Sequence, residues 1–232
     1  MTEPSKREQD RLAPILDDLR KAGQSEGRIP LVRKLIDEPN AINRLTSMLM
    51  NGRHEDRLFA ARVLYDIHSV ASDDAKDPAF ADKAAKLDII AQAPIAPLTR
   101  ALWYCPEPDI VVNDIRGERA ANDVKTTIIF NLIEIGGRDQ MRSVASYFDN
   151  RNTDPLMREY IASTIESRLT GSSRERLSDQ AIGIIRDWMQ RIADSDHEPD
   201  TASNQMITGM IGKPEIRKIL FPLEGAVPRR QM

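Results

Sequence analysis

The chain has 232 residues, a formal net charge of −3, only 5% aromatic residues and one cysteine, Cys105. A single cysteine excludes an internal disulfide framework, no apolar run approaches the ~18 residues that span a bilayer, and near-neutral charge disfavours a dedicated nucleic-acid binder. The opening residues 1–11 lack the apolar core of a signal peptide, so we expect a soluble, cytoplasmic protein.

The predicted elements are all helices. Hydrophobic residues make up 41% of the chain, and they are mainly Leu, Ile, Val, Ala and Met. Aromatic and β-branched runs, which favour strands, are scarce. The only strand-like run, 110–112, is short and lies between a proline and a glycine. The sequence therefore predicts an all-α fold.

The first 40 residues are expected to form N-terminal capping helices. A helix over 5–22 begins with Ser5 and Glu8 in the spacing of a capping box. A short helix follows over 30–37, with Pro30 in its first turn.

A first clear helix pair follows over 41–50 and 56–71, joined by a tight turn at Asn51-Gly52. The polar run 72–78 is expected to be a loop. Helices are then predicted over 78–92 and 94–104. The first of these has apolar contacts at Leu87, Ile89 and Ile90, and the second ends in Trp103-Tyr104.

Residues 105–117 interrupt this pattern. Two prolines and a glycine predict a loop, yet Ile110, Val111, Val112 and Ile115 are too apolar for a freely solvated one. We expect this insertion either to fold back onto the core or to cover a surface.

Three helical segments are predicted within 123–169, separated by a break at Gly136-Gly137 and by a polar turn with Asp154-Pro155. A basic residue stands seven positions before a large apolar one at Arg57/Leu64, Lys125/Leu132 and Arg158/Ile165. The apolar members are separated by 68 and 33 residues, about two periods and one period. A period of this size is typical of stacked helix pairs.

The pattern resembles HEAT repeats, which are related to armadillo repeats. Residues 154–158, DPLMR, resemble the start of a second HEAT helix, and 95–98, IAPL, resemble a first helix with its proline. The resemblance covers 41–194 and implies a short α-solenoid of stacked antiparallel helix pairs. Where the family carries an aspartate six residues before the basic position, this chain has Asn51, Arg119 and Asn152.

The C-terminal part, 195–232, is expected to hold short helices and a flexible tail. It follows a long helix predicted over 172–194. Two short helices are predicted over 203–221, broken at Gly212-Lys213-Pro214, and residues 223–232 are expected to be mobile.

No motif predicts a catalytic residue, a cofactor or a metal site. His54, His68 and His197 are far apart, and with one cysteine there is no zinc-ligand spacing. An enzyme on a HEAT-like frame would need acidic groups that converge in a groove, and the candidates are Asp66, Glu134 and Glu166. An enzyme is less expected than a binding protein but is left open.

The candidate partner-binding residues form two sets. The basic residues Arg57, Lys125 and Arg158, with Arg62, would line one face of a stacked solenoid. They suit an acidic peptide or a phosphate backbone, although hydrogen bonding between repeats is the favoured role. Trp103 and Tyr104 either mark a partner pocket or fill the junction between a helix and the insertion.

The leading hypothesis is a non-catalytic protein–protein interaction module, such as an adaptor, scaffold or assembly factor. The resemblance implies this role, since HEAT-like stacks expose long binding surfaces. The alternatives are nucleic-acid binding through a basic concave face and an enzyme or lyase on the same frame. An irregular helical bundle without repeat geometry is the alternative fold.

Overall fold

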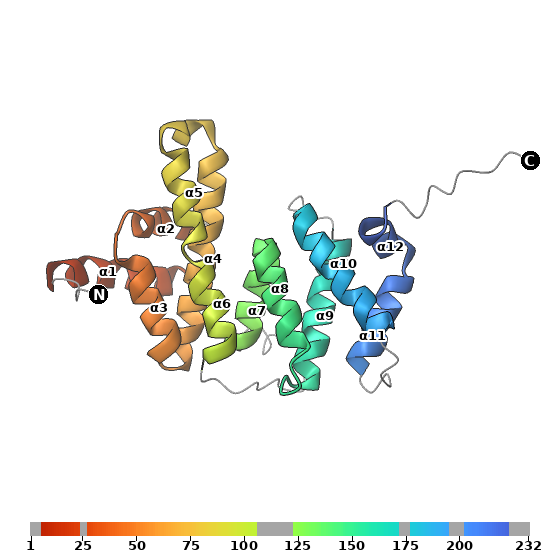
Figure 1. The fold of residues 1–232 in the computed structure, drawn as a ribbon. Coiled ribbons are helices and arrows are strands. Elements are labelled where there is room, and N and C mark those ends of the chain that lie inside the picture. Colours follow the sequence, from red (N-terminus) through yellow and green to blue (C-terminus); the bar gives the residue numbers. More distant parts are fainter. Residues whose placement is uncertain (1–5, 24–26, 106–122, 172–176, 195–201, 223–232) are drawn as a thin grey trace, which may run out of the picture. The chain divides into compact units, whose positions relative to one another are not determined.

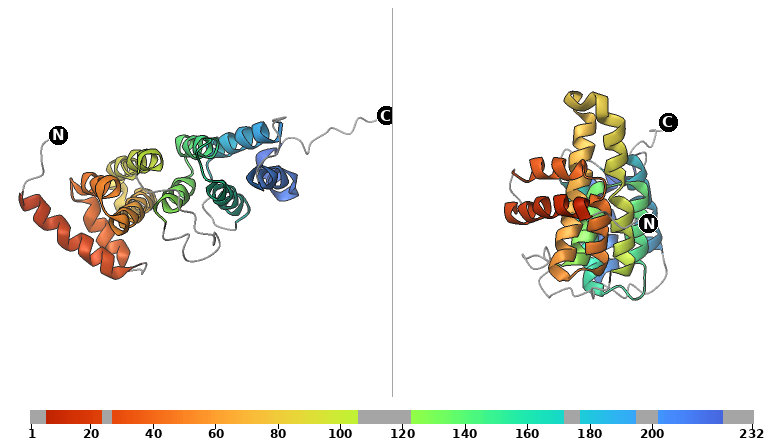
Figure 2. Two further views of the ribbon diagram at one scale, coloured as in Figure 1. Left: turned by 90° about the horizontal axis from the view of Figure 1, so that it is seen from below. Right: turned by 90° about the vertical axis from the view of Figure 1, so that its left-hand side faces the viewer.

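The computed structural model describes residues 6–23, 27–105, 123–171, 177–194 and 202–222. Throughout these ranges the regular structure is helical and contains no strand, so the predicted all-α class is confirmed. The chain divides into two compact units, Met1–Pro108 and Asp109–Met232. The border falls inside the segment 41–194 that was expected to hold the repeats. Figures 1 and 2 show the helices of each unit.

The first unit is built around its longest helix, α4. The helices in chain order are α1 (Lys6–Ala22), α2 (Arg28–Ile36), α3 (Ala41–Asn51), α4 (His54–Lys76), the 3-10 turn η1 (Pro78–Lys83), α5 (Ala84–Gln92) and α6 (Ile95–Tyr104). Helices α2, α3, α5 and α6 pack against α4, and α1 packs against α2. Figure 1 shows α4 and α5 as an extended hairpin.

Helix α4 is longer than the sequence predicts. The expected loop at 72–78 is wrong as far as Lys76, because tertiary contacts hold this polar stretch in the helix. Ala71 packs in a small core with Leu87 and Ala91 of α5. The next turn holds Asp74, which is only 5% exposed and bonds to Arg33 of α2. A buried acidic residue with a cationic partner on α2 thus extends the helix beyond its apolar pattern.

The helix predicted over 78–92 is also modified. Its first six residues form the 3-10 turn, in which Phe80 has a non-helical backbone (φ −117°, ψ 18°). Leu87 is buried as predicted, but Ile89 is 74% exposed, so its expected role as a core contact is wrong. The physical reason is that α5 buries only one narrow side, against α4 and η1.

The second unit contains α7 (Val124–Ile135), α8 (Arg138–Phe148), α9 (Pro155–Thr170), α10 (Asp179–Asp194), α11 (Ala202–Gly212) and α12 (Pro214–Leu220). Helices α7, α8 and α9 pack against one another, α10 lies on α8, and α11 lies on α9. The predicted break at Gly212–Pro214 is present. The long helix expected over 172–194 begins at Asp179, where Ser178 accepts a hydrogen bond from the Ala181 amide.

The apolar members of the repeat register lie in the core. Leu64, Leu132 and Ile165 are almost completely buried. Several predictions lie outside the described residues, namely the Ser5 cap, the insertion from 106 onward, the position of Arg119 and the tail 223–232. None of the helices in the described ranges has both the length and the apolar character needed to cross a bilayer.

Candidate docking surface

In the second unit, two of the basic register residues are held by their own unit. Lys125 is 7% exposed, and its Nζ donates to the Tyr147 hydroxyl at 3.2 Å. The half-buried Arg158 donates through Nη2 to the carbonyl of Asn150 at 2.8 Å, and its guanidinium lies 5.9 Å from the Phe148 ring centroid. Because these contacts join neighbouring helices, they fit the structural alternative for the register.

The register residue of the first unit, Arg57, and the nearby Arg62 lie on α4 and are half-buried. Arg62 stands one turn before Asp66; burial raises the pKa of that carboxyl group, and the charge of Arg62 offsets a part of the rise. Arg57 and Arg62 both take part in further contacts within the chain.

Ion pairs connect the N-terminal helices to α4. Arg20 of α1 contacts Asp56 at 2.5 Å, and Arg28 at the start of α2 contacts Asp66 at 2.6 Å. Arg33 of α2 forms two bonds to Asp74, of 2.8 and 2.6 Å. The three aspartates therefore fix α1 and α2 along the length of α4.

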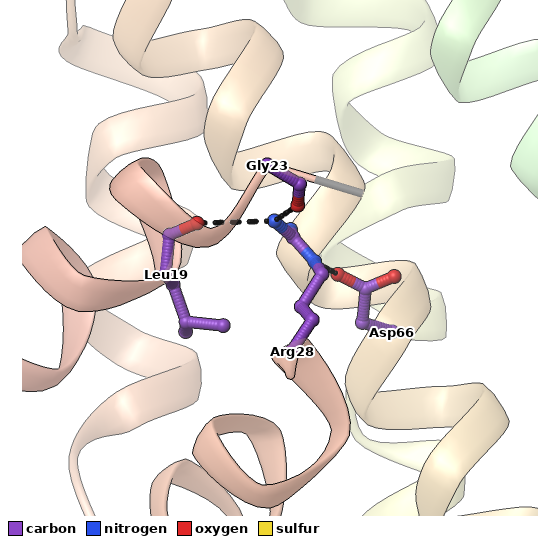
Figure 3. A network of polar contacts seen from close by, with 4 residues as sticks. All are labelled: Leu19, Gly23, Arg28 and Asp66. Atoms are coloured by element: carbon purple, nitrogen blue, oxygen red, sulfur yellow. Dashed lines mark hydrogen bonds and ion pairs between the residues drawn. The ribbon is translucent and has the colours of Figure 1, made fainter. Parts of the chain in front are cut away.

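Arg28 is the centre of a polar network (Figure 3). Its Nε donates to Asp66, and its Nη1 donates to the carbonyl oxygens of Gly23 at 2.7 Å and Leu19 at 3.3 Å. These carbonyls lie at the C-terminal end of α1, where a helix lacks internal donors and carries partial negative charge. One arginine thus satisfies the end of α1 and ties it to α4.

The environment shifts the pKa values of two of these aspartates in opposite directions. Burial raises the pKa of Asp66, and the charges of Arg28 and Arg62 only partly offset this rise. The hydrogen bond from Arg20 lowers the pKa of Asp56. Desolvation disfavours a carboxylate, whereas a close cation favours it.

The acids considered for a catalytic groove are each bound to a cation. Asp66 belongs to the first unit and pairs with Arg28. In the second unit, Glu134 pairs with Arg168 at 3.3 Å, and Glu166 pairs with Lys213. Among the described residues, no group of three or more His, Cys, Asp or Glu side chains is arranged to hold a metal ion.

Helix α6 presents an exposed aromatic face. Its buried side, formed by Leu98, Ala101 and Leu102, packs against α3 and α4. On its other side, Trp103 is 36% exposed and Tyr104 is 71% exposed. The helix therefore ends in two large aromatic side chains that the core does not enclose, and the insertion that follows them lies outside the described residues.

Two arginines of this face were missed in the sequence. Arg100 is exposed one turn before Trp103 and Tyr104, and Arg44 is exposed on the neighbouring α3. Neither belongs to the repeat register, so periodicity gave no reason to select them. A detectable signal was the lack of any acidic residue in 41–51 and 95–104.

Comparisons with protein-family models, curated proteins and solved structures found no match to this chain.

Proposed function

We propose that this protein is a non-catalytic protein–protein interaction module, an adaptor or assembly factor that docks a partner on the exposed face of α6. The observation that carries the proposal is the exposure of Tyr104 and Trp103 at the end of a helix whose other side is buried. Trp and Tyr are enriched among residues that dominate interface energies, and Arg100 beside them belongs to the same class.

We further propose that the helix pairs form a short HEAT-like α-solenoid. The support is the repeated register, in which a cation stands seven residues before a fully buried Leu64, Leu132 or Ile165. A second support is the link from Arg158 to the turn before its own helix. In this interpretation, Lys125 and Arg158 stabilise the stack and are not the docking site.

Affinity capture tests the function. The full chain is immobilised and exposed to a nuclease-treated native lysate of its source cells, beside a Trp103→Ala/Tyr104→Ala variant. We expect a defined protein to be retained by the parent chain and lost from the variant, because truncation removes the aromatic contact area. Both side chains are partly or largely exposed, so we expect the variant to stay folded. Circular dichroism checks this.

Ile89→Ala is the matched control. It removes an even more exposed apolar side chain from α5 of the same unit and should leave capture unchanged. Equal loss in both variants would indicate nonspecific adhesion and contradict the proposal. A parallel capture from untreated lysate completes the test: material that the chain retains only without nuclease would instead favour nucleic-acid binding.

A further inference from the structure

Helices α3 and α6 form one layer on α4. Both pack against α4 and against each other, and Figure 1 shows them side by side. The Sγ atom of Cys105, directly after α6, lies 3.8 Å from the Leu49 carbonyl near the end of α3. The C-terminal ends of the two helices are therefore adjacent.

This contact relates the positions of two arginines along the axes of α3 and α6. Arg44 lies five residues before Leu49, and Arg100 lies five residues before Cys105. At the rise of an α-helix, each arginine stands about 7.5 Å along its axis from the contact. Both side chains are exposed, while the buried faces of their helices lie against α4. The two arginines thus stand at matching levels along their helices, with exposed side chains.

The outer face has no negative charge of its own. The chain contains 36 acidic residues, yet α3 and α6 contain none, and Arg44 and Arg100 are their only charged residues. Within the described ranges, neither guanidinium group forms an ion pair. By contrast, Arg20, Arg28 and Arg33 of the same unit are each paired with an aspartate.

From this arrangement we infer that the outer face of α3 and α6 docks an acidic segment of a partner protein. Carboxylates of that segment bind Arg44 and Arg100, since a guanidinium group matches a carboxylate in a two-point hydrogen bond. Apolar side chains of the same segment pack on Trp103 and Tyr104. The inference rests on the proposed function and adds the chemistry of the partner.

A protein segment fits this face better than a nucleic acid. Nucleic-acid binding draws its affinity from many phosphate contacts, whereas α3 and α6 offer two cations. The whole chain also has a net charge of −3, which disfavours the binding of a polyanion such as a nucleic acid. A short acidic and apolar segment needs only the two arginines and the two aromatic residues.

The test selects ligands from a phage-displayed library of random dodecapeptides on the immobilised full chain. We expect enrichment of peptides that combine Asp or Glu with large apolar residues. Binding of one synthetic enriched peptide should weaken at least about tenfold in Arg44→Glu/Arg100→Glu, because each charge-assisted contact is replaced by repulsion. Affinity should also fall as salt concentration rises.

Arg142→Glu/Arg151→Glu is the matched control. It changes the net charge equally at two exposed arginines of the second unit and should leave affinity within about twofold. Far-ultraviolet circular dichroism shows whether each variant is folded.

The outcomes separate the two proposals. Peptides that depend on Trp103 and Tyr104 but lack acidic enrichment, and bind the Arg44/Arg100 variant normally, would overturn this inference and leave the docking function standing. Selection of no peptide that depends on either pair would overturn both. Binding of a labelled single-stranded DNA that needs Arg44 and Arg100, with no peptide selected, would replace the acidic protein segment with a nucleic acid.

Discussion

Arg33 and Asp74 form a two-point ion pair that connects α2 to the last turn of α4. Nε donates to Oδ2 at 2.8 Å, and Nη2 donates to Oδ1 at 2.6 Å. The carboxylate is 7% exposed and the arginine side chain 47%, and the guanidinium also lies over the Phe80 ring. Such a pair holds an acidic residue inside a helix where the sequence predicts a loop.

Arg33→Ala should destabilise the first unit by about 1–3 kcal/mol, because Asp74 would remain buried without its cation. Chemical denaturation followed by Trp103 fluorescence in a Trp188→Phe background measures this unit, since the chain has one tryptophan in each unit. Arg186→Ala removes an exposed ion pair with the adjacent Asp187. It should destabilise the second unit by less than about 0.5 kcal/mol, measured through Trp188 in a Trp103→Phe background. Equal costs would show that Asp74 is solvated.

The pH dependence of stability should differ between Asp56 and Asp66. A lowered folded-state pKa at Asp56 contributes stability that is present above the ordinary value of 3.8 and is lost as pH falls through the folded value. The raised pKa of Asp66 has the opposite effect on the pH dependence of stability. There the folded state gains stability as pH falls through its raised value, and the gain is complete below 3.8.

Carboxyl chemical shifts from NMR titration would give both pKa values directly. Arg28→Ala should raise the pKa of Asp66 further, because, of the two cations that offset the effect of burial, Arg28 has the larger effect. Arg44→Ala serves as the control, since Arg44 lies on another helix and should leave this value unchanged. A pKa of Asp66 below 3.8 in the parent protein would refute the dominance of burial.

The fold class and most helices could be predicted from periodicity. The errors occur where the structure of a segment depends on residues distant in the sequence. The break at Gly212–Pro214 was visible because glycine and proline act locally. The end of α4 was not, because it depends on Arg33 some 41 residues away. Ile89 is as apolar as its buried neighbour Leu87, and only the packing of α5 separates them.

The candidate site shows the same division. Trp103 and Tyr104 could be selected from the sequence because aromatic residues are rare in this chain. Arg44 and Arg100 could not, since their importance depends on α3 lying beside α6. The burial of Lys125 was equally hidden, because a lysine on an amphipathic helix normally keeps its ammonium group in water.

Gly136→Ala should destabilise the second unit by about 1 kcal/mol or more, because its positive φ of 65° disfavours a side chain. An added Cβ would also stand 3.1 Å from Leu177 Cδ2. Gly183→Ala should stabilise the same unit by about 0.4–1 kcal/mol, because this glycine lies within α10 and its added Cβ meets no atom within 4 Å. Denaturation monitored through Trp188 in a Trp103→Phe background measures both; the same sign of change for the two variants would contradict the geometry.

Lys125→Ala should destabilise the second unit by about 2 kcal/mol and leave partner capture unchanged. The lysine is 7% exposed, and its loss removes buried packing and a hydrogen bond to the Tyr147 hydroxyl. Tyr147→Phe deletes only that hydroxyl and should cost about 1 kcal/mol. The measurement pairs Trp188-detected denaturation with affinity capture at a temperature where both variants are folded. If Lys125→Ala instead abolished capture while stability stayed at the parent value, the basic register would be the docking site and the face of α6 would not.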